Sequence, residues 1–291
     1  MPVATNFVVS QVSSGGGNGP LTPVAGTRTT PPFALNHPRF LVSNILQGYD
    51  TVTATSSTPS STPLNALKPN TFEKWRFSTS DSTLNVDFGE TAKQFDMLCI
   101  GGHNLGNATA NVQVWYKPSV GAAFLQFAQA EQLSFGQNKP LCFYSQTILS
   151  AVEIELRITG CNGVPEMSYV SAGVALQMQR PIFNGHTPIT DGDVTSYYHN
   201  KTESGNIIGQ SIRSQGYKTE YSWQNIDDTW YRTYFAPFKQ AIKTQPFFIA
   251  WNLLEYPLDV GFGRVAQDIS TSMQNGTVTK RGGLSFELLG F

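Results

Sequence analysis

From Phe72 to about Arg180 the sequence repeats one pattern, a short apolar alternation that ends in turn residues and starts again about every 10 positions. Segments such as NVQVWY and VEIELRI alternate apolar and polar residues, as strands with one face in water do. MLCI, by contrast, is apolar throughout, which is typical of a central strand covered on both faces. Strands of this length and spacing predict an all-β chain built around an antiparallel β-sandwich.

The same alternation predicts which side chains form the core of that sandwich. Successive residues of a strand point to opposite faces, so one set from each strand is buried together. We expect the inward set to be Val86, Phe88, Leu98, Ile100, Val112, Val114, Ile154 and Leu156.

The sequence before this region differs in character. Residues 1–35 are rich in Gly, Pro, Ser and Thr and hold too few apolar side chains to offset the entropy of ordering them, which predicts an extended N-terminal arm. Such an arm either reaches a neighbouring subunit or is a free end, and the sequence leaves both open. We assign residues 36–181 to the sandwich domain and 182–291 to a second, β-rich C-terminal domain.

Within the C-terminal domain the signals compete. SYYHNKTESGNIIGQSIRSQGYKTEYSWQNI is typical of polar strands and turns, and QPFFIAWNLL, DVGFGRVAQ and GGLSFELLGF of further strands. The segment DDTWYRTYFAPFKQAIKT fits either a short helix or an irregular connection.

Charge excludes some classes of partner. Charged residues make up 13% of the chain, about half the usual share, and the formal net charge is −1. No basic run is available to hold phosphates, so we expect no nucleic-acid binding. No stretch approaches a membrane span and the first residues lack a signal peptide, so we expect a soluble protein made in the cytoplasm, without a membrane partner. Low surface charge also indicates surfaces that become buried on assembly.

The cysteines and the catalytic motifs predict no reactive centre. Cys99, Cys142 and Cys161 are an odd number in apolar contexts without CxxC spacing, so we interpret them as reduced core residues rather than metal ligands. No GxSxG, HExxH, Walker or GxGxxG pattern is found. We therefore expect no catalytic residues, no metal and no cofactor, and a protein that is not an enzyme.

Two polar clusters resemble sites but have simpler interpretations. His103 and Asn104 follow a strand and two glycines, where a turn needs positive φ and a side chain that bonds the backbone. The pairs Asp227-Asp228 and Asp191-Asp193 fit solvated turn residues or a helix N-cap better than the facing carboxylates of a hydrolase.

One stretch of the predicted sandwich carries a family resemblance. It contains a Trp after a polar loop, a strand ending in an Asp-apolar-Gly turn, a buried strand and a His-Asn-Leu turn. This order resembles the galactose-binding (discoidin-like) β-sandwich, a jelly-roll fold, and the Gly-His-Asn-Leu turn resembles bacteriophage tail and virion proteins. The matching residues are Trp75, Val86-Asp87-Phe88-Gly89, Leu98-Cys99-Ile100 and His103-Asn104-Leu105.

The C-terminal domain carries a weaker resemblance to phage tail-associated proteins, in Trp230 and in the segments 235–238, 246–248 and 286–291. It also holds a dense group of aromatic residues, a kind of side chain favoured at protein interfaces. We predict that this group forms an interface and that some of its rings are exposed. The group is Tyr217, Tyr221, Trp223, Trp230, Tyr231, Tyr234, Phe235 and Phe238.

These resemblances imply two functions. The first is a non-enzymatic virion structural protein, a phage tail or tail-tip (baseplate) component that forms a homo-oligomer and assembles with other tail proteins, located in the virion after synthesis in the host cytoplasm. The alternative is a carbohydrate-binding adhesin that recognises a host-surface glycan. In the galactose-binding fold glycans bind at the loops of one end, which implies Trp75, Arg76 and Asn104 as the binding residues here.

Overall fold

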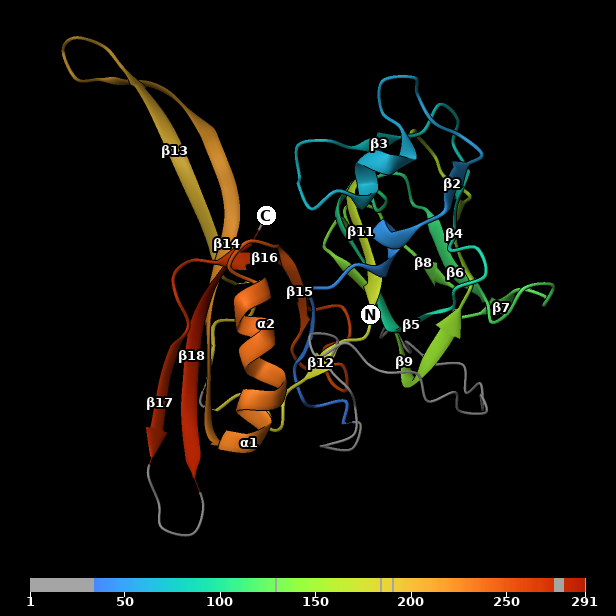
Figure 1. Ribbon diagram of the computed structural model, residues 1–291. Coiled ribbons are helices and arrows are strands. Elements are labelled where there is room, and N and C mark those ends of the chain that lie inside the picture. The colour runs from blue at the N-terminus through green and yellow to red at the C-terminus, as the bar shows by residue number, and fades with distance from the viewer. Residues whose placement is uncertain (1–33, 129, 184, 190, 275–279, 291) are drawn as a thin grey trace.

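The computed structural model describes residues 34–128, 130–183, 185–189, 191–274 and 280–290, so the predicted arm lies almost wholly outside the described residues. The described residues form three antiparallel sheets and one longer helical segment, stacked as four layers (Figure 1). The order is helix, eight-stranded sheet, four-stranded sheet and six-stranded sheet. The predicted class, an all-β chain with an antiparallel sandwich and a second β-rich unit, is confirmed.

The four- and six-stranded sheets make the sandwich. The four-stranded sheet has the order β3 (Trp75–Arg76), β11 (Glu166–Gly173), β5 (Lys93–His103) and β9 (Leu141–Ala151). The six-stranded sheet has the order β2 (Thr51–Ala54), β4 (Ser82–Asp87), β10 (Glu153–Thr159), β6 (Asn111–Lys117) and β7 (Leu125–Gln126), with β8 (Glu131–Gln132) also paired to β6. Two short 3-10 turns, η1 (Ile45–Gly48) and η2 (Pro63–Leu67), both contact β11.

The sandwich core is the one that the alternation predicts. All eight residues of the expected inward set are buried in a single cluster between these two sheets. Strands β4, β6 and β10 alternate buried residues with half-buried ones, and β10 ends on an exposed residue, because their outer face meets water.

Strand β5 is buried on both faces, as its apolar run predicts. Leu98 and Ile100 point into the sandwich core, whereas Met97 and Cys99 point the other way. On that side they meet Phe262 and other residues of the eight-stranded sheet, which therefore lies directly on the sandwich. Cys99 lies opposite Cys142 across β5 and β9, and both are buried free cysteines; Cys161 is half-buried.

The eight-stranded sheet combines both ends of the sequence. Arg39 pairs with Ala250, so a strand from the predicted sandwich domain lies in the C-terminal sheet. The strand order is β12 (Leu176–Gln177), β1 (Arg39–Leu41), β15 (Phe247–Ala250), β16 (Val260–Val265), β18 (Arg281–Gly290), β14 (Ile207–Asp227) and β13 (Asp193–Lys201), with β17 (Ser270–Gln274) also paired to β18.

A buried ion pair joins this sheet to the sandwich. The Arg39 Nη2 atom on β1 lies 2.9 Å from the Asp96 Oδ2 atom on β5, and both side chains are fully buried. The other Asp96 carboxylate oxygen accepts a hydrogen bond from the backbone N–H of Ala175, 2.9 Å away. The two units are thus connected by a contact that leaves neither charge in water.

The segment with competing signals is helical. It runs through α1 (Asp228–Trp230), the π-helical turn η3 (Tyr231–Phe235) and α2 (Ala236–Ala241). Asp227 caps it, since its Oδ1 accepts a hydrogen bond from the Trp230 N–H at 2.9 Å, which is the predicted N-cap role. Among the described residues no helix is long and apolar enough to span a membrane.

The predicted aromatic interface is mostly a core. Six of its eight rings are buried, and they pack between the helical segment and the eight-stranded sheet with Phe40, Phe247 and Phe286. Only Tyr231 and Tyr234 are partly exposed. The predicted interface role is therefore corrected for the six buried rings, because a one-layer sheet and a short helix need large side chains to fill the space between them.

Strands β13 and β14 form a hairpin that extends well beyond the rest of the molecule (Figure 1). Residues 217–227 of β14 pair with β18 and contribute to the core, but residues 207–216 pair only with β13. Almost every residue of this outer part is exposed, and several are apolar: Val194, Tyr197, Tyr198, Ile207, Ile208 and Ile212.

Candidate functional site

Trp75 is not available to a ligand. Its side chain is fully buried in the sandwich core, where it packs against Phe77 with the ring centroids 4.4 Å apart. Its Nε1–H donates to the backbone carbonyl of Ser56 at 3.1 Å. The ring closes the end of the core, so its predicted role in glycan stacking is corrected to a packing role.

Arg76 and Asn104 do lie near one another, at the end of the four-stranded sheet. Arg76 is exposed and pairs with Glu166, whose backbone N–H donates to Asn104 Oδ1 at 2.8 Å. The Asn104 Nδ2 donates to the backbone carbonyl of Val164. Both polar groups of Asn104 are thus used by the turn, as the simpler interpretation predicts.

His103 also serves the turn. Its Nδ1 accepts a hydrogen bond from the N–H of Leu105, and Gly102 before it has a φ of +61°. Burial lowers the pKa of His103 to about 4, partly offset by the backbone of Lys139, so the imidazole is neutral at physiological pH. A neutral, enclosed imidazole is suited to structure rather than to proton transfer with a solute.

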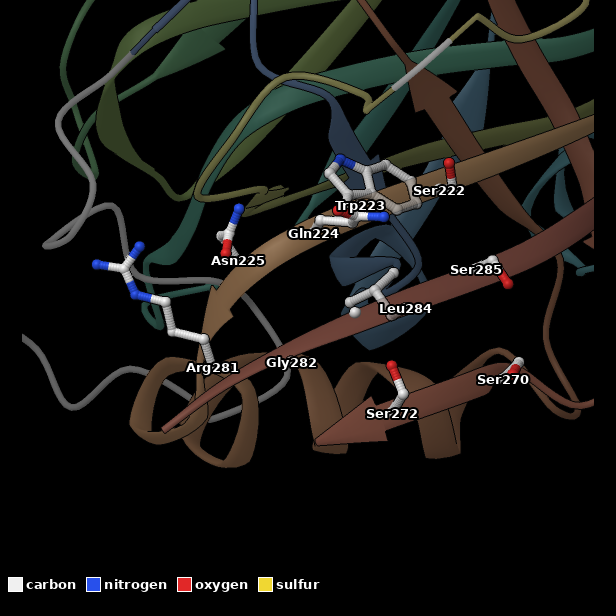
Figure 2. A pocket seen from close by; sticks show the side chains of 11 residues that line it. Ser222, Trp223, Gln224, Asn225, Ser270, Ser272, Arg281, Gly282, Leu284 and Ser285 are labelled. Carbon is white, nitrogen blue, oxygen red and sulfur yellow. The ribbon is translucent and has the colours of Figure 1, made fainter. Parts of the chain in front are cut away.

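Two hollows in the surface of the described residues are considered as candidate sites. The first, the polar hollow, lies on β14, β17 and β18 and has a volume of about 290 Å³. Figure 2 shows Asn225 and Arg281 at one end and Ser270 and Ser285 toward the other. The lining residues are Ser222, Trp223, Gln224, Asn225, Ser270, Ser272, Arg281, Gly282, Gly283, Leu284 and Ser285.

A β-bulge creates the polar hollow. The register of β14 against β18 shifts between Trp223 and Ile226, and Asn225 takes a positive φ of 59°. Gly282 opposite the bulge allows close approach, since a Cβ there would lie 2.5 Å from Met273 Sδ. Trp223 is only 1% exposed, so the hollow offers hydrogen-bonding groups but no open aromatic face.

The second, the aromatic hollow, lies between the sandwich and the C-terminal sheet. It has a volume of about 420 Å³ and is formed by the loop before β9 and the loop before β16. Tyr256 is 50% exposed here and stacks on Trp251, with the ring centroids 5.0 Å apart and the planes 20° from parallel. The lining residues are Gln137, Lys139, Pro140, Leu141, Glu255, Tyr256, Pro257, Leu258 and Asp259.

Hydrogen bonds fix the loop that carries Tyr256. Asn252 Oδ1 accepts from the N–H groups of Leu254 and Glu255, each at 3.2 Å, and the Tyr256 N–H donates to the Asn252 carbonyl at 2.9 Å. Asp259 Oδ2 accepts from Trp251 Nε1 at 2.7 Å, which holds the ring that supports Tyr256. The aromatic face is therefore preorganised before any ligand arrives.

One of the lining residues, Asp259, has a carboxylate oxygen without a hydrogen-bond partner in the part of the chain that the structure describes. This oxygen, Oδ1, is buried. Lys139 and Gln137 lie across the hollow, on a loop that packs against the Asn104 turn through Gly106. Mostly apolar walls, one aromatic face and a few polar groups are the usual composition of a small-molecule site.

No sequence motif marks this hollow. Lys139 and Tyr256 are more than 100 positions apart in the sequence and neither belongs to a motif. The one available signal was an aromatic residue beside proline and acidic residues, in EYPLD, within a loop where no strand pattern requires a buried ring.

Comparison with known proteins gives structural similarity only. No family model matches the chain, and no curated protein matches it. A family 32 carbohydrate-binding module from C. perfringens in complex with galactose is 15% identical, with a TM-score of 0.37, over 45% of this chain and 97% of that one. A pectin-binding carbohydrate-binding module is 13% identical, with a TM-score of 0.36, over 43% of this chain and 89% of that one.

Glycosidases also show this similarity, but only over a small part of their length. A putative α-L-fucosidase from Bacteroides thetaiotaomicron is 18% identical, with a TM-score of 0.39, over 46% of this chain and 29% of that one. None of the three structures is described as a phage protein, so the resemblance to virion proteins stays a prediction, as does the absence of an activity.

Proposed function

We propose that this chain is a non-enzymatic carbohydrate-binding protein that holds a neutral saccharide in the aromatic hollow. The observation that carries the proposal is the half-exposed ring of Tyr256, backed by Trp251, in a hollow whose walls are mostly apolar with a few polar side chains. A sugar ring presents one apolar face of C–H groups and a rim of hydroxyls, and this hollow offers a partner for each.

The polar side chains favour a neutral ligand. Glu255 and Asp259 face the hollow together with one cation, Lys139, so an acidic sugar would meet more negative than positive charge. The Gln137 side-chain amide can donate to a hydroxyl group, since its Oε1 already accepts from the Ser134 N–H at 3.1 Å. The polar hollow, which lacks an exposed ring, is the weaker site for the same ligand.

A glycan array tests the proposal. The full-length protein is applied to neutral and acidic oligosaccharides, and the best neutral hit is titrated by calorimetry. We expect Tyr256→Ala to weaken binding at least about tenfold, which corresponds to about 1.4 kcal/mol, because it removes the stacking face.

Tyr49→Ala is the matched control, since Tyr49 is a similarly exposed tyrosine, at 41%, outside the hollow. Both variants should keep the wild-type melting temperature, and the glycan should be recovered intact by mass spectrometry. No binding to any neutral glycan, or equal affinity for wild type and Tyr256→Ala, contradicts the proposal.

A second candidate function is that of a virion structural component, which would be found in phage particles. The projecting β13–β14 hairpin favours it, because an extended ribbon with exposed apolar residues is suited to contacts between subunits. Mass spectrometry of purified particles is the test, and absence of the chain from the particles removes this candidate.

A further inference from the structure

We propose that strand β13 pairs edge to edge with β13 of a second copy of this chain, which joins two eight-stranded sheets across a twofold axis at Tyr197. This inference does not rest on the glycan site. It concerns the only long strand at the end of the described eight-stranded sheet.

The outer edge of β13 is open. On one side β13 pairs with β14, from Asp193 opposite Tyr217 to Lys201 opposite Ile207. On the other side no segment within the described ranges pairs or hydrogen-bonds with it. An edge of this length carries a row of backbone donors and acceptors ready for another strand.

The edge lacks the features that normally block such pairing. Between Asp193 and Lys201 the sequence is VTSYYHN, with no proline, no Lys, Arg, Asp or Glu, and several β-branched or aromatic residues. The two register shifts of the hairpin place their extra residues, Arg213 and Ile208, on β14. Strand β13 therefore stays regular along its whole length.

The sequence of β13 is complementary to itself. In an antiparallel pair centred on Tyr197, Asp193 of one copy lies opposite Lys201 of the second copy, and the same contact recurs at the other end by symmetry. Thr195 lies opposite His199, and the two Tyr197 residues lie opposite each other. Both charges of the strand are thus paired, which no shifted register achieves.

The pairing also gives the exposed apolar side chains a partner. Tyr197 and Ile212 are opposite residues of β13 and β14, so they share a face, and they are 50% and 59% exposed. In the paired sheet Ile212 and Tyr197 of each copy form a continuous row of four. A two-stranded ribbon, marginal by itself in water, becomes a four-stranded one.

Analytical ultracentrifugation of the full-length chain, from about 1 to about 200 µM, tests the proposal. A nine-residue edge makes a small interface, so we expect a dimer with a dissociation constant in the micromolar range. Tyr197→Lys places two ammonium groups together at the axis and should raise that constant by more than about tenfold. Val120→Lys, at an exposed valine on the sandwich, is the control that should leave it unchanged.

Charge reversal tests the register in which the two β13 strands pair. Asp193→Lys and Lys201→Asp should each weaken the dimer, most clearly at low salt, and the double variant Asp193→Lys/Lys201→Asp should restore it. Circular dichroism checks that every variant is folded. A wild-type chain that stays monomeric, a dimer unaffected by Tyr197→Lys, or a double variant no better than the single ones overturns the proposal.

Discussion

Strands β5 and β13 differ in how many of their faces the rest of the protein covers, and this difference determines how much of each strand is buried. From Phe95 to Gly101 every residue of β5 is buried, because the sandwich core lies on one side and the C-terminal sheet on the other. In β13 only Thr195 is even partly buried. The two strands show that the spacing of apolar residues reports how many faces are covered: the unbroken run MLCI in β5, and only Val194 and the Tyr197-Tyr198 pair among polar residues in β13.

The largest effect is expected where both faces are covered. Leu98→Asp places a charge in the sandwich core without a partner, and we expect a loss of more than about 4 kcal/mol, enough to abolish soluble folding. Soluble yield and circular dichroism measure this. A variant with the normal melting temperature would mean that Leu98 does not lie in a core that excludes water.

Next comes the buried ion pair between β5 and β1. Asp96→Ala leaves the Arg39 guanidinium buried without its carboxylate, and we expect a loss of about 3–5 kcal/mol in urea unfolding. The double variant Arg39→Met/Asp96→Leu, which removes both charges, should recover most of that stability. A double variant as unstable as the single one would show that the two side chains stabilise the protein through their packing rather than through the pairing of their charges.

The change in unfolding free energy with pH, which depends on His103 at the end of β5, is expected to be somewhat smaller than the effect of breaking the ion pair. His103 has a folded pKa of about 4, below the 6.5 of the unfolded chain, so the unfolded state binds its proton first as pH falls. Its contribution is fully present above pH 6.5 and is lost between pH 6.5 and 4, by about 3 kcal/mol. His103→Asn should flatten the unfolding free energy over this range relative to wild type, and parallel curves would contradict the prediction.

The smallest effect is expected in the hairpin. Ile208→Ser, at a residue 70% exposed, should change the unfolding free energy by less than about 0.5 kcal/mol at low micromolar concentration. Ile249→Ser is the matched comparison, because Ile249 is fully buried on β15 and its loss should cost several times more. Equal costs at the two sites would erase the distinction between covered and uncovered strands.

The local sequence pattern was sufficient to predict the core of the sandwich, but not the arrangement of the C-terminal sheet beside it. The inward positions of β4, β6 and β10, and the double coverage of β5, follow from alternation alone. The placement of β1 in the C-terminal sheet does not, because a three-residue strand carries no signal about a partner some 210 positions away. Trp75 lies on a two-residue strand, too short for alternation to show which way its ring points.

The candidate site was predictable only in its general position. The family resemblance implied loops at one end of the sandwich, at Trp75, Arg76 and Asn104; none of these lines the aromatic hollow, although the loop that packs on the Asn104 turn contributes Gln137 and Lys139 to it. The ring opposite them comes from a C-terminal loop, and only the docking of the two units brings Tyr256 there.

The position of β1 has a consequence for synthesis on the ribosome. Phe40 lies at the centre of the aromatic core, yet its neighbours Phe247 and Phe286 leave the ribosome only some 210 residues or more after it. At typical rates of translation that interval is roughly 10–40 s. During that time the sandwich can close, and β1 can already contact β5 through Arg39 and pair with β12, but Phe40 still lacks its aromatic neighbours. The Phe40 side of β1 is therefore among the last surfaces of the described fold to be covered, and until then it is open to chaperones and to misassembly.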